Sequence, residues 1–161
     1  MAEQTLVHYS KHPLTEIRSV SVAEQGDHHK PKGLWVSVLG ECDWKSWCEG
    51  EGFSLPNLSI AHRIILSDKA DILRLSNAQD IDQFTLEFAR PERYGSRYEI
   101  DWQRVANGRD GIIIAPYVWE RRLNGGADWY YRWDCASGCI WNASAVKQII
   151  PMQSEAAICA H

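Results

Sequence analysis

The sequence predicts a mixed α+β fold built from short strands and a few small helices. Runs of β-branched and aromatic residues recur along the chain, segments with helical character are short, and the sequence contains no internal repeat or low-complexity tract. A chain of 161 residues, 45% of them hydrophobic and 24% charged, is long enough for one hydrophobic core. We therefore expect a single domain spanning residues 1–161.

The first half of the chain is expected to consist mainly of strands. Strands are predicted at residues 5–10, 33–38, 57–66 and 72–75. Residues 11–32 carry Pro, Gly and polar side chains without a clear period, which is typical of a loop or a short helix. Asp43 is a suitable N-cap for a helix over residues 44–53.

The second half is predicted to contain the best helix, residues 77–89. Asn77 is a good N-cap and Asp80 follows three residues later, although the apolar positions give only partial amphipathicity. Pro116 is expected to close a buried strand. The other predicted elements are strands at 111–115, 129–133 and 138–141, helical turns at 101–106 and 142–147, and loops at 90–97 and 121–128.

Charge and hydropathy argue against two classes of protein. A net charge of −4 does not suit a dedicated binder of duplex nucleic acid, although a short basic patch stays open. No apolar run reaches the roughly 20 residues needed to span a bilayer, and residues 1–10 lack the features of a signal peptide. We expect a cytoplasmic protein without a membrane partner, and its five cysteines are expected to be reduced.

Cysteine chemistry offers two candidate sites. Cys135 and Cys139 stand four residues apart, but no second cysteine pair and no suitably spaced histidine pair follows them. Packing within a strand is therefore expected rather than zinc binding. Cys48 with His62 is a conceivable nucleophilic dyad, for which packing is again the simpler explanation. The sequence contains no signature of a phosphate loop, a dinucleotide-binding fold or a serine hydrolase.

Tryptophan is unusually frequent, with eight residues spread over most of the chain. Two explanations stay open. The indole rings could fill a small core, or some of them could line a cleft that binds a flat ring by stacking.

Three motifs follow one another: His8-Tyr9-Ser10 in the first predicted strand, G-L-W-V-S (residues 33–37) in the second, and C-I-W-N-A-S-A-V (residues 139–146) in a late one. Their order and spacing resemble those of the ADP-ribosyltransferase superfamily, in the branch of diphtheria toxin and the poly(ADP-ribose) polymerases. The resemblance covers most of the chain and implies a split, strongly bent antiparallel sheet. It also implies that NAD⁺ is a substrate, from which ADP-ribose is transferred to a macromolecule and nicotinamide is released.

The resemblance implies roles for residues around an NAD⁺ site. His8 would donate to a ribose hydroxyl, and the two residues after it would hold the nicotinamide carboxamide. Trp35 would sandwich the cationic nicotinamide ring with Trp47 or Trp44, because an aromatic face attracts positive charge. A packed core is the alternative explanation for His8, Trp35 and Trp47. The candidate NAD⁺-binding residues are His8, Tyr9, Ser10, Trp35, Ser37, Trp44 and Trp47.

One position departs from the family pattern. The branch carries a late-strand glutamate that bonds the ribose 2′-hydroxyl and stabilises the transition state, and Ser137 occupies that position here. The reaction could proceed without a carboxylate, Asp134 could supply one, or catalysis could be lost while nucleotide binding is kept. An exposed strand end is the alternative explanation for Asp134. The candidate catalytic residues are His8, Ser137 and Asp134.

The loop before the late strand contacts the acceptor in this superfamily, and the matching residues are 121–133. Gly125 and Gly126 would make this loop mobile. The aromatic cluster that follows them consists of Trp129, Tyr130, Tyr131 and Trp133. If exposed, this cluster would recognise a protein or the bases of a nucleic acid, whereas alternation into a sheet would bury two of its members.

Three hypotheses therefore stand: an NAD⁺-dependent ADP-ribosyltransferase, a catalytically silent NAD⁺- or ADP-ribose-binding module of the same fold, and a tryptophan-rich interaction protein. The stretches D-G-I-I-I-A-P-Y and W-D-C-A-S-G-C-I-W resemble stretches in small proteins of bacteriophages and mobile elements. This resemblance would place the acceptor in a bacterial cytosol.

Overall fold

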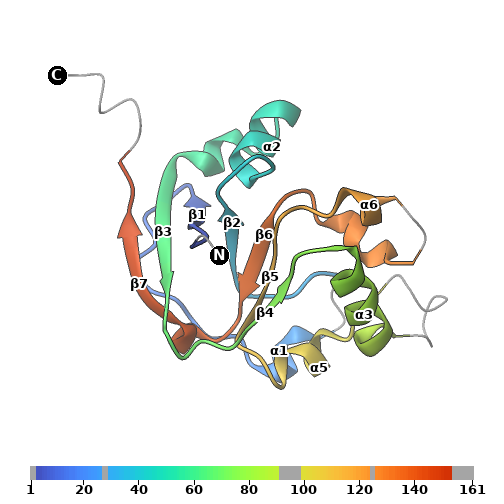
Figure 1. Ribbon diagram of the computed structural model, residues 1–161. Helices are drawn as coiled ribbons and strands as arrows, with labels where there is room; N and C mark the ends of the chain where they lie inside the picture. Colours follow the sequence, from blue (N-terminus) through green and yellow to red (C-terminus); the bar gives the residue numbers. More distant parts are fainter. Residues whose placement is uncertain (1–2, 27–28, 91–98, 124–125, 154–161) are drawn as a thin grey trace.

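The computed structural model describes residues 3–26, 29–90, 99–123 and 126–153, which form one curved sheet with short helices packed around it (Figure 1). The fold is mixed α+β with few and short helices, as the sequence predicts. No helix in these ranges has the length and apolar character needed to cross a bilayer.

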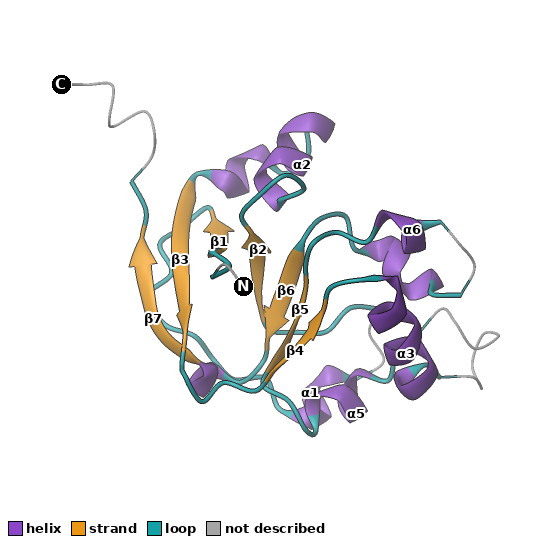
Figure 2. Ribbon diagram, viewed as in Figure 1, coloured by secondary structure: helices purple, strands orange, loops and turns teal. Residues whose placement is uncertain are grey.

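The described residues contribute seven strands to the sheet, in the order β4-β5-β6-β2-β1-β3-β7. The strands are β1 (Leu6–Ser10), β2 (Leu34–Val38), β3 (Ile60–Leu66), β4 (Ile72–Leu75), β5 (Gly111–Ile114), β6 (Ser137–Ile140) and β7 (Val146–Pro151). Neighbours are antiparallel, except that β4 and β5 run parallel. The sheet curves strongly between β7 at one edge and β4 at the other (Figure 2).

The pairing between β1 and β2 is much shorter than the pairing between β1 and β3. Strands β1 and β2 share only the pairs Leu6 with Val38 and Val7 with Ser37, whereas five residue pairs join β1 to β3. The ladder between β1 and β2 therefore ends at Val7.

The helices begin where local capping groups are available. Asp43 accepts a hydrogen bond from the Ser46 amide at 2.9 Å, and Asn77 accepts one from the Asp80 amide at 2.9 Å, so both predicted N-caps are confirmed. The α-helices are α1 (Val22–Gln25), α2 (Trp44–Glu51), α3 (Ala78–Phe88), α5 (Trp102–Ala106) and α6 (Trp119–Arg122). The described residues also form three 3₁₀ turns: η1 (Leu55–Leu58), η2 (Asp128–Arg132) and η3 (Ala143–Ala145).

An aromatic cluster forms much of the core beside α3. Phe84, Trp102, Trp129 and Trp133 make ring contacts with centroid separations of 5.2–6.5 Å. The tryptophans differ in burial along the chain. Trp102, Trp129, Trp133 and Trp141 are buried, Trp35, Trp44 and Trp47 are half-buried near β2 and α2, and Trp119 is exposed.

Strands β5 and β6 approach one another closely at Gly138. A Cβ atom at this position would lie 2.5 Å from the Ile112 carbonyl oxygen, so the contact between the two strands requires glycine.

Two predictions about local structure need correction, a third lies mostly outside the described residues, and one strand was not predicted. Residues 129–132 belong to the turn η2 rather than to a strand, with Trp133 as its C-cap, and Trp129 packs from this turn against Phe84 of α3. Strand β7 was not predicted, and the start of the loop predicted at 121–128 belongs to α6. Most of the loop predicted at 90–97 lies outside the described residues.

Candidate functional site

A cavity of about 290 Å³ lies along β1 and β2, where the ladder between the two strands ends. Its wall also includes the segment before β2, the first residue of α2 and the segment that leads into β6. The lining residues are Val7, His8, Tyr9, Lys30, Trp35, Val36, Ser37, Trp44, Asp134, Cys135 and Ser137.

The cavity brings together most of the candidate residues identified in the sequence. Seven of the nine line it: His8, Tyr9, Trp35, Ser37, Trp44, Asp134 and Ser137. The other two lie outside it. The Ser10 hydroxyl donates to the His12 carbonyl at 2.6 Å, and the Trp47 ring stacks on Trp44 with a centroid separation of 5.2 Å.

His8 joins the two strands that form the cavity. Its Nδ1 lies 2.7 Å from the Trp35 carbonyl oxygen, and because a carbonyl only accepts, Nδ1 must carry the proton. Burial lowers the pKa of His8, and the positive charge of a protonated His62 would lower it further, against the raising effect of the Trp35 hydrogen bond. The neutral ring therefore offers Nε2 as a hydrogen-bond acceptor.

Trp35 and Ser37 shape the wall contributed by β2. The Trp35 ring is half-buried against Trp133, with ring centroids 5.0 Å apart. The Ser37 hydroxyl accepts a hydrogen bond from the Trp44 amide at 2.9 Å. This bond ties the backbone of the first residue of α2 to β2, beside the cavity that Trp44 lines.

Asp134 is the half-buried carboxylate of the cavity wall. The Arg122 guanidinium lies 3.6 Å from it and also donates to the Tyr117 hydroxyl at 2.6 Å. Ser137 lies deeper, where its hydroxyl donates to the Cys135 carbonyl at 3.1 Å. The carboxylate available to a ligand is therefore that of Asp134 rather than a group at position 137.

Lys30 lines the cavity and was not predicted. Its Nζ lies 4.5 Å from the centroid of the Trp35 ring, and among the described residues no carboxylate is within ion-pair distance of it. Burial lowers the pKa of Lys30, although the nearby Asp134 carboxylate acts to raise it. The only signal in the sequence was the basic K-P-K run before the second strand, which does not distinguish Lys30 from Lys32.

The cysteines considered as zinc ligands or as a nucleophile, Cys135, Cys139 and Cys48, are buried in the structure. Cys135 and Cys139 are buried free thiols, and burial raises the pKa of both, that of Cys135 to about 12. Within the described ranges no three His, Cys, Asp or Glu side chains gather as metal ligands would. For the possible dyad, His62 Nε2 already accepts a hydrogen bond from the Leu14 amide at 2.9 Å, and burial raises the pKa of Cys48.

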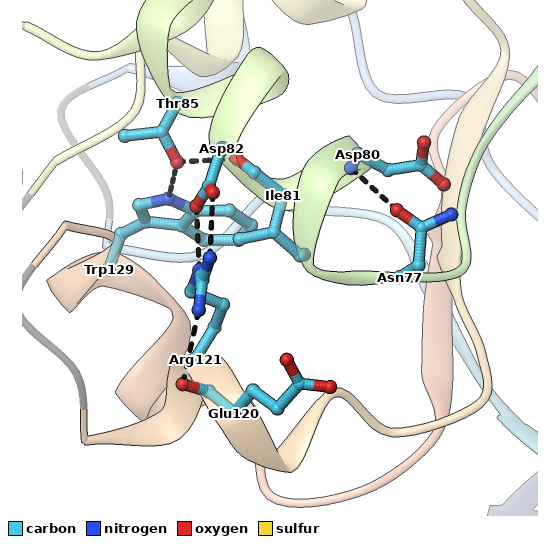
Figure 3. Close-up of polar contacts among 8 residues, drawn as sticks. All are labelled: Asn77, Asp80, Ile81, Asp82, Thr85, Glu120, Arg121 and Trp129. Carbon is cyan, nitrogen blue, oxygen red and sulfur yellow. Dashed lines mark hydrogen bonds and ion pairs between the residues drawn. The ribbon is translucent and has the colours of Figure 1, made fainter.

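The aromatic cluster expected at the acceptor surface is largely buried, which corrects the sequence prediction. The buried members are Trp129, Tyr130 and Trp133, and Tyr131 alone is exposed, at 55%. Trp129 Nε1 donates to the Thr85 hydroxyl at 2.8 Å, so this residue is anchored to α3 (Figure 3). These three rings cannot contact an acceptor on the surface.

The segment around α6 is also tied to α3. The Arg121 guanidinium donates two hydrogen bonds to the Asp82 carboxylate, at 2.7 and 2.8 Å (Figure 3). A bidentate pair of this kind is more directional than a single ion pair. The described residues on either side of positions 124–125 are therefore fixed against the same helix.

Comparisons with known proteins give no match for this chain among protein-family models, curated proteins or solved structures.

Proposed function

We propose that the cavity binds NAD⁺ as a substrate and that the protein is an NAD⁺-dependent ADP-ribosyltransferase. One observation carries this proposal: His8, Trp35 and Asp134, far apart in the sequence, line a single cavity. They offer an acceptor for a sugar hydroxyl, a flat face for a cationic ring and a carboxylate that can stabilise developing positive charge.

The environment of Trp35 supports binding of the nicotinamide ring. A cation already lies over this face, since Lys30 Nζ is 4.5 Å from the ring centroid, and the nicotinamide ring of NAD⁺ is also positively charged. The volume of about 290 Å³ is near the lower end of small-molecule pockets, which begin at about 300 Å³. The cavity would hold nicotinamide and its ribose, with the rest of the dinucleotide outside.

The sheet is compatible with the fold that the sequence resemblance implies. It is strongly curved, mostly antiparallel and narrowed to two residue pairs between β1 and β2, as expected of a split, bent sheet. The proposed site lies at this narrow point, which supports the assignment of the first two motifs to a ligand-binding role.

The proposed reaction begins with cleavage of the bond between nicotinamide and C1″ of the ribose. The electron pair of that bond leaves with nicotinamide, and the positive charge that develops on the ribose is stabilised by the Asp134 carboxylate. His8 Nε2 accepts a hydrogen bond from a ribose hydroxyl, in place of the donor role implied by the resemblance. A macromolecular nucleophile then bonds to C1″ and releases its proton to Asp134 or water.

Titration with NAD⁺ tests this proposal. We expect NAD⁺ to quench tryptophan fluorescence and free nicotinamide to accumulate over hours, with both effects reduced in His8→Ala and Trp35→Ala. Ser10→Ala and Trp119→Ala are the matched controls, because Ser10 and Trp119 lie outside the cavity. Absence of both quenching and nicotinamide release at millimolar NAD⁺ would exclude the proposed function.

A catalytically silent NAD⁺- or ADP-ribose-binding module is the second candidate. It is favoured by Ser137, which has no charge and whose hydroxyl is already bonded to the Cys135 carbonyl. The same titration separates the two candidates, because a silent module would show quenching without release of nicotinamide.

A further inference from the structure

Lys30 occupies the face of Trp35 on which the nicotinamide ring would stack. Its Nζ lies 4.5 Å from the centroid of Trp35 and 5.7 Å from that of Trp133. Both Lys30 and Trp35 line the same cavity. A nicotinamide ring on Trp35 and the ammonium group of Lys30 would therefore compete for one place.

The position of Lys30 is not fixed by an ion pair. Among the described residues its Nζ has no carboxylate within ion-pair distance, and Asp134 influences it only from further away. A lysine stem has four flexible carbons, so the ammonium group can move while the backbone stays in place. An incoming cation would repel it, because like charges at short range in a partly dehydrated site interact strongly.

We propose that Lys30 is a specificity-determining residue, which selects ligands that carry an anionic group next to their cationic ring. This inference rests on the proposed function. When NAD⁺ binds, the ammonium group of Lys30 is displaced from Trp35 and pairs with the pyrophosphate. A ligand with the same ring but no phosphate must displace Lys30 without this compensation. Lys30 therefore favours the dinucleotide over smaller nicotinamide compounds.

Three ligands separate the two effects of Lys30. NAD⁺ has the cationic ring and the pyrophosphate, nicotinamide riboside has the ring and ribose, and 1-methylnicotinamide has the charged ring alone. Binding of each is measured by calorimetry to the wild type, Lys30→Met and Lys30→Arg. Lys32→Met is the control, because Lys32 is exposed in the same segment and does not line the cavity.

Lys30→Met should change the affinities in opposite directions. We expect nicotinamide riboside and 1-methylnicotinamide to bind about tenfold more tightly, because no cation has to leave Trp35. NAD⁺ should bind about tenfold more weakly, because its pyrophosphate loses a charged partner. Lys30→Arg should keep the preference for NAD⁺, and Lys32→Met should change none of the affinities.

Equal changes for all three ligands, or no change, would overturn the inference while leaving the proposed function intact. Thermal unfolding of the variants without ligand identifies a merely structural role, in which Lys30→Met lowers the melting temperature and weakens every ligand alike. If none of the three ligands binds to the wild type or to any variant, both the inference and the proposed function are overturned.

Discussion

The Nδ1 atom of His8 lies 2.7 Å from the carbonyl oxygen of Trp35 and connects β1 to β2 beyond the last residue pair of their ladder. The side chain thus provides the contact that the backbones no longer make. Because the imidazole has only one other nitrogen, this bond also determines which atom faces a ligand.

The lowered pKa of His8 predicts a pH-dependent contribution to stability. Below the usual pKa of 6.5 the unfolded chain binds a proton at His8 more readily than the folded protein does. This contribution is therefore fully present above pH 6.5 and is lost as the pH falls through the acidic range to the lowered pKa of the folded state. In His8→Asn, an amide can still donate to Trp35 but does not titrate. Urea unfolding at several pH values should show that the free energy of unfolding falls less toward acid pH in His8→Asn than in the wild type. Identical pH profiles for the two proteins would contradict a contribution from His8.

Asp134→Asn should separate binding from turnover. If Asp134 stabilises positive charge on the ribose, its amide analogue should slow nicotinamide release by about 100-fold or more, with little change in NAD⁺ affinity. Ser137→Ala should have a much smaller effect, because the Ser137 hydroxyl is bonded to the Cys135 carbonyl. Single-turnover release and fluorescence titration measure the two quantities. The opposite ranking of the two variants would assign the chemistry to Ser137.

Thr85→Val should destabilise the protein through Trp129. The Thr85 hydroxyl accepts the hydrogen bond of the buried Trp129 indole at 2.8 Å, and valine has the same shape without this acceptor. A buried donor without a partner costs about 1–3 kcal/mol of unfolding free energy. Thr85→Ser keeps the hydroxyl and should lower the free energy of unfolding less than Thr85→Val does. A loss of unfolding free energy as large or larger for Thr85→Ser than for Thr85→Val in urea unfolding would contradict a dominant role of the hydrogen bond.

Gly138→Ala should destabilise the sheet at the contact of β5 with β6. The new Cβ atom would lie 2.5 Å from the Ile112 carbonyl oxygen, and overpacking of this kind costs about 1–3 kcal/mol. Gly50→Ala in α2 is the control, because nothing lies within 4 Å of its added Cβ atom. Because alanine favours a helix more than glycine does, Gly50→Ala should stabilise the protein by about 0.5–1 kcal/mol. Thermal unfolding compares the two, and a stable Gly138→Ala variant would mean that the strands can separate at this point.

Local chemistry made much of the fold predictable. Asp43 and Asn77 have side chains that cap their own helices, so sequence alone indicated where α2 and α3 begin. Strand β4 was predicted with its observed bounds, Ile72–Leu75. These features depend on neighbours in the chain.

The errors concern features decided by distant contacts. Trp129, Tyr130 and Trp133 have strand-like side chains, but they lie in or directly after a helical turn and all three are buried, Trp129 against Phe84 of α3 and Tyr130 against Tyr117. Strand β7 lies at the edge of the sheet, and its alternation of buried and exposed residues is weak. Lys30 was overlooked because its place over Trp35 comes from tertiary structure, which no spacing rule in the sequence describes.

The strand order has a consequence for how the chain folds during synthesis. Strand β1 lies between β2 and β3, and β3 is followed in the sheet by β7, from the other end of the described chain. On the other side, β2 pairs with β6, more than 90 residues later. Neither part of the sheet can be completed until the last strands leave the ribosome, and sheets dominated by distant pairings fold slowly. Until β6 and β7 have been made, the emerging chain therefore carries unpaired edges on β2 and β3, and chaperones that shield such edges should raise its yield.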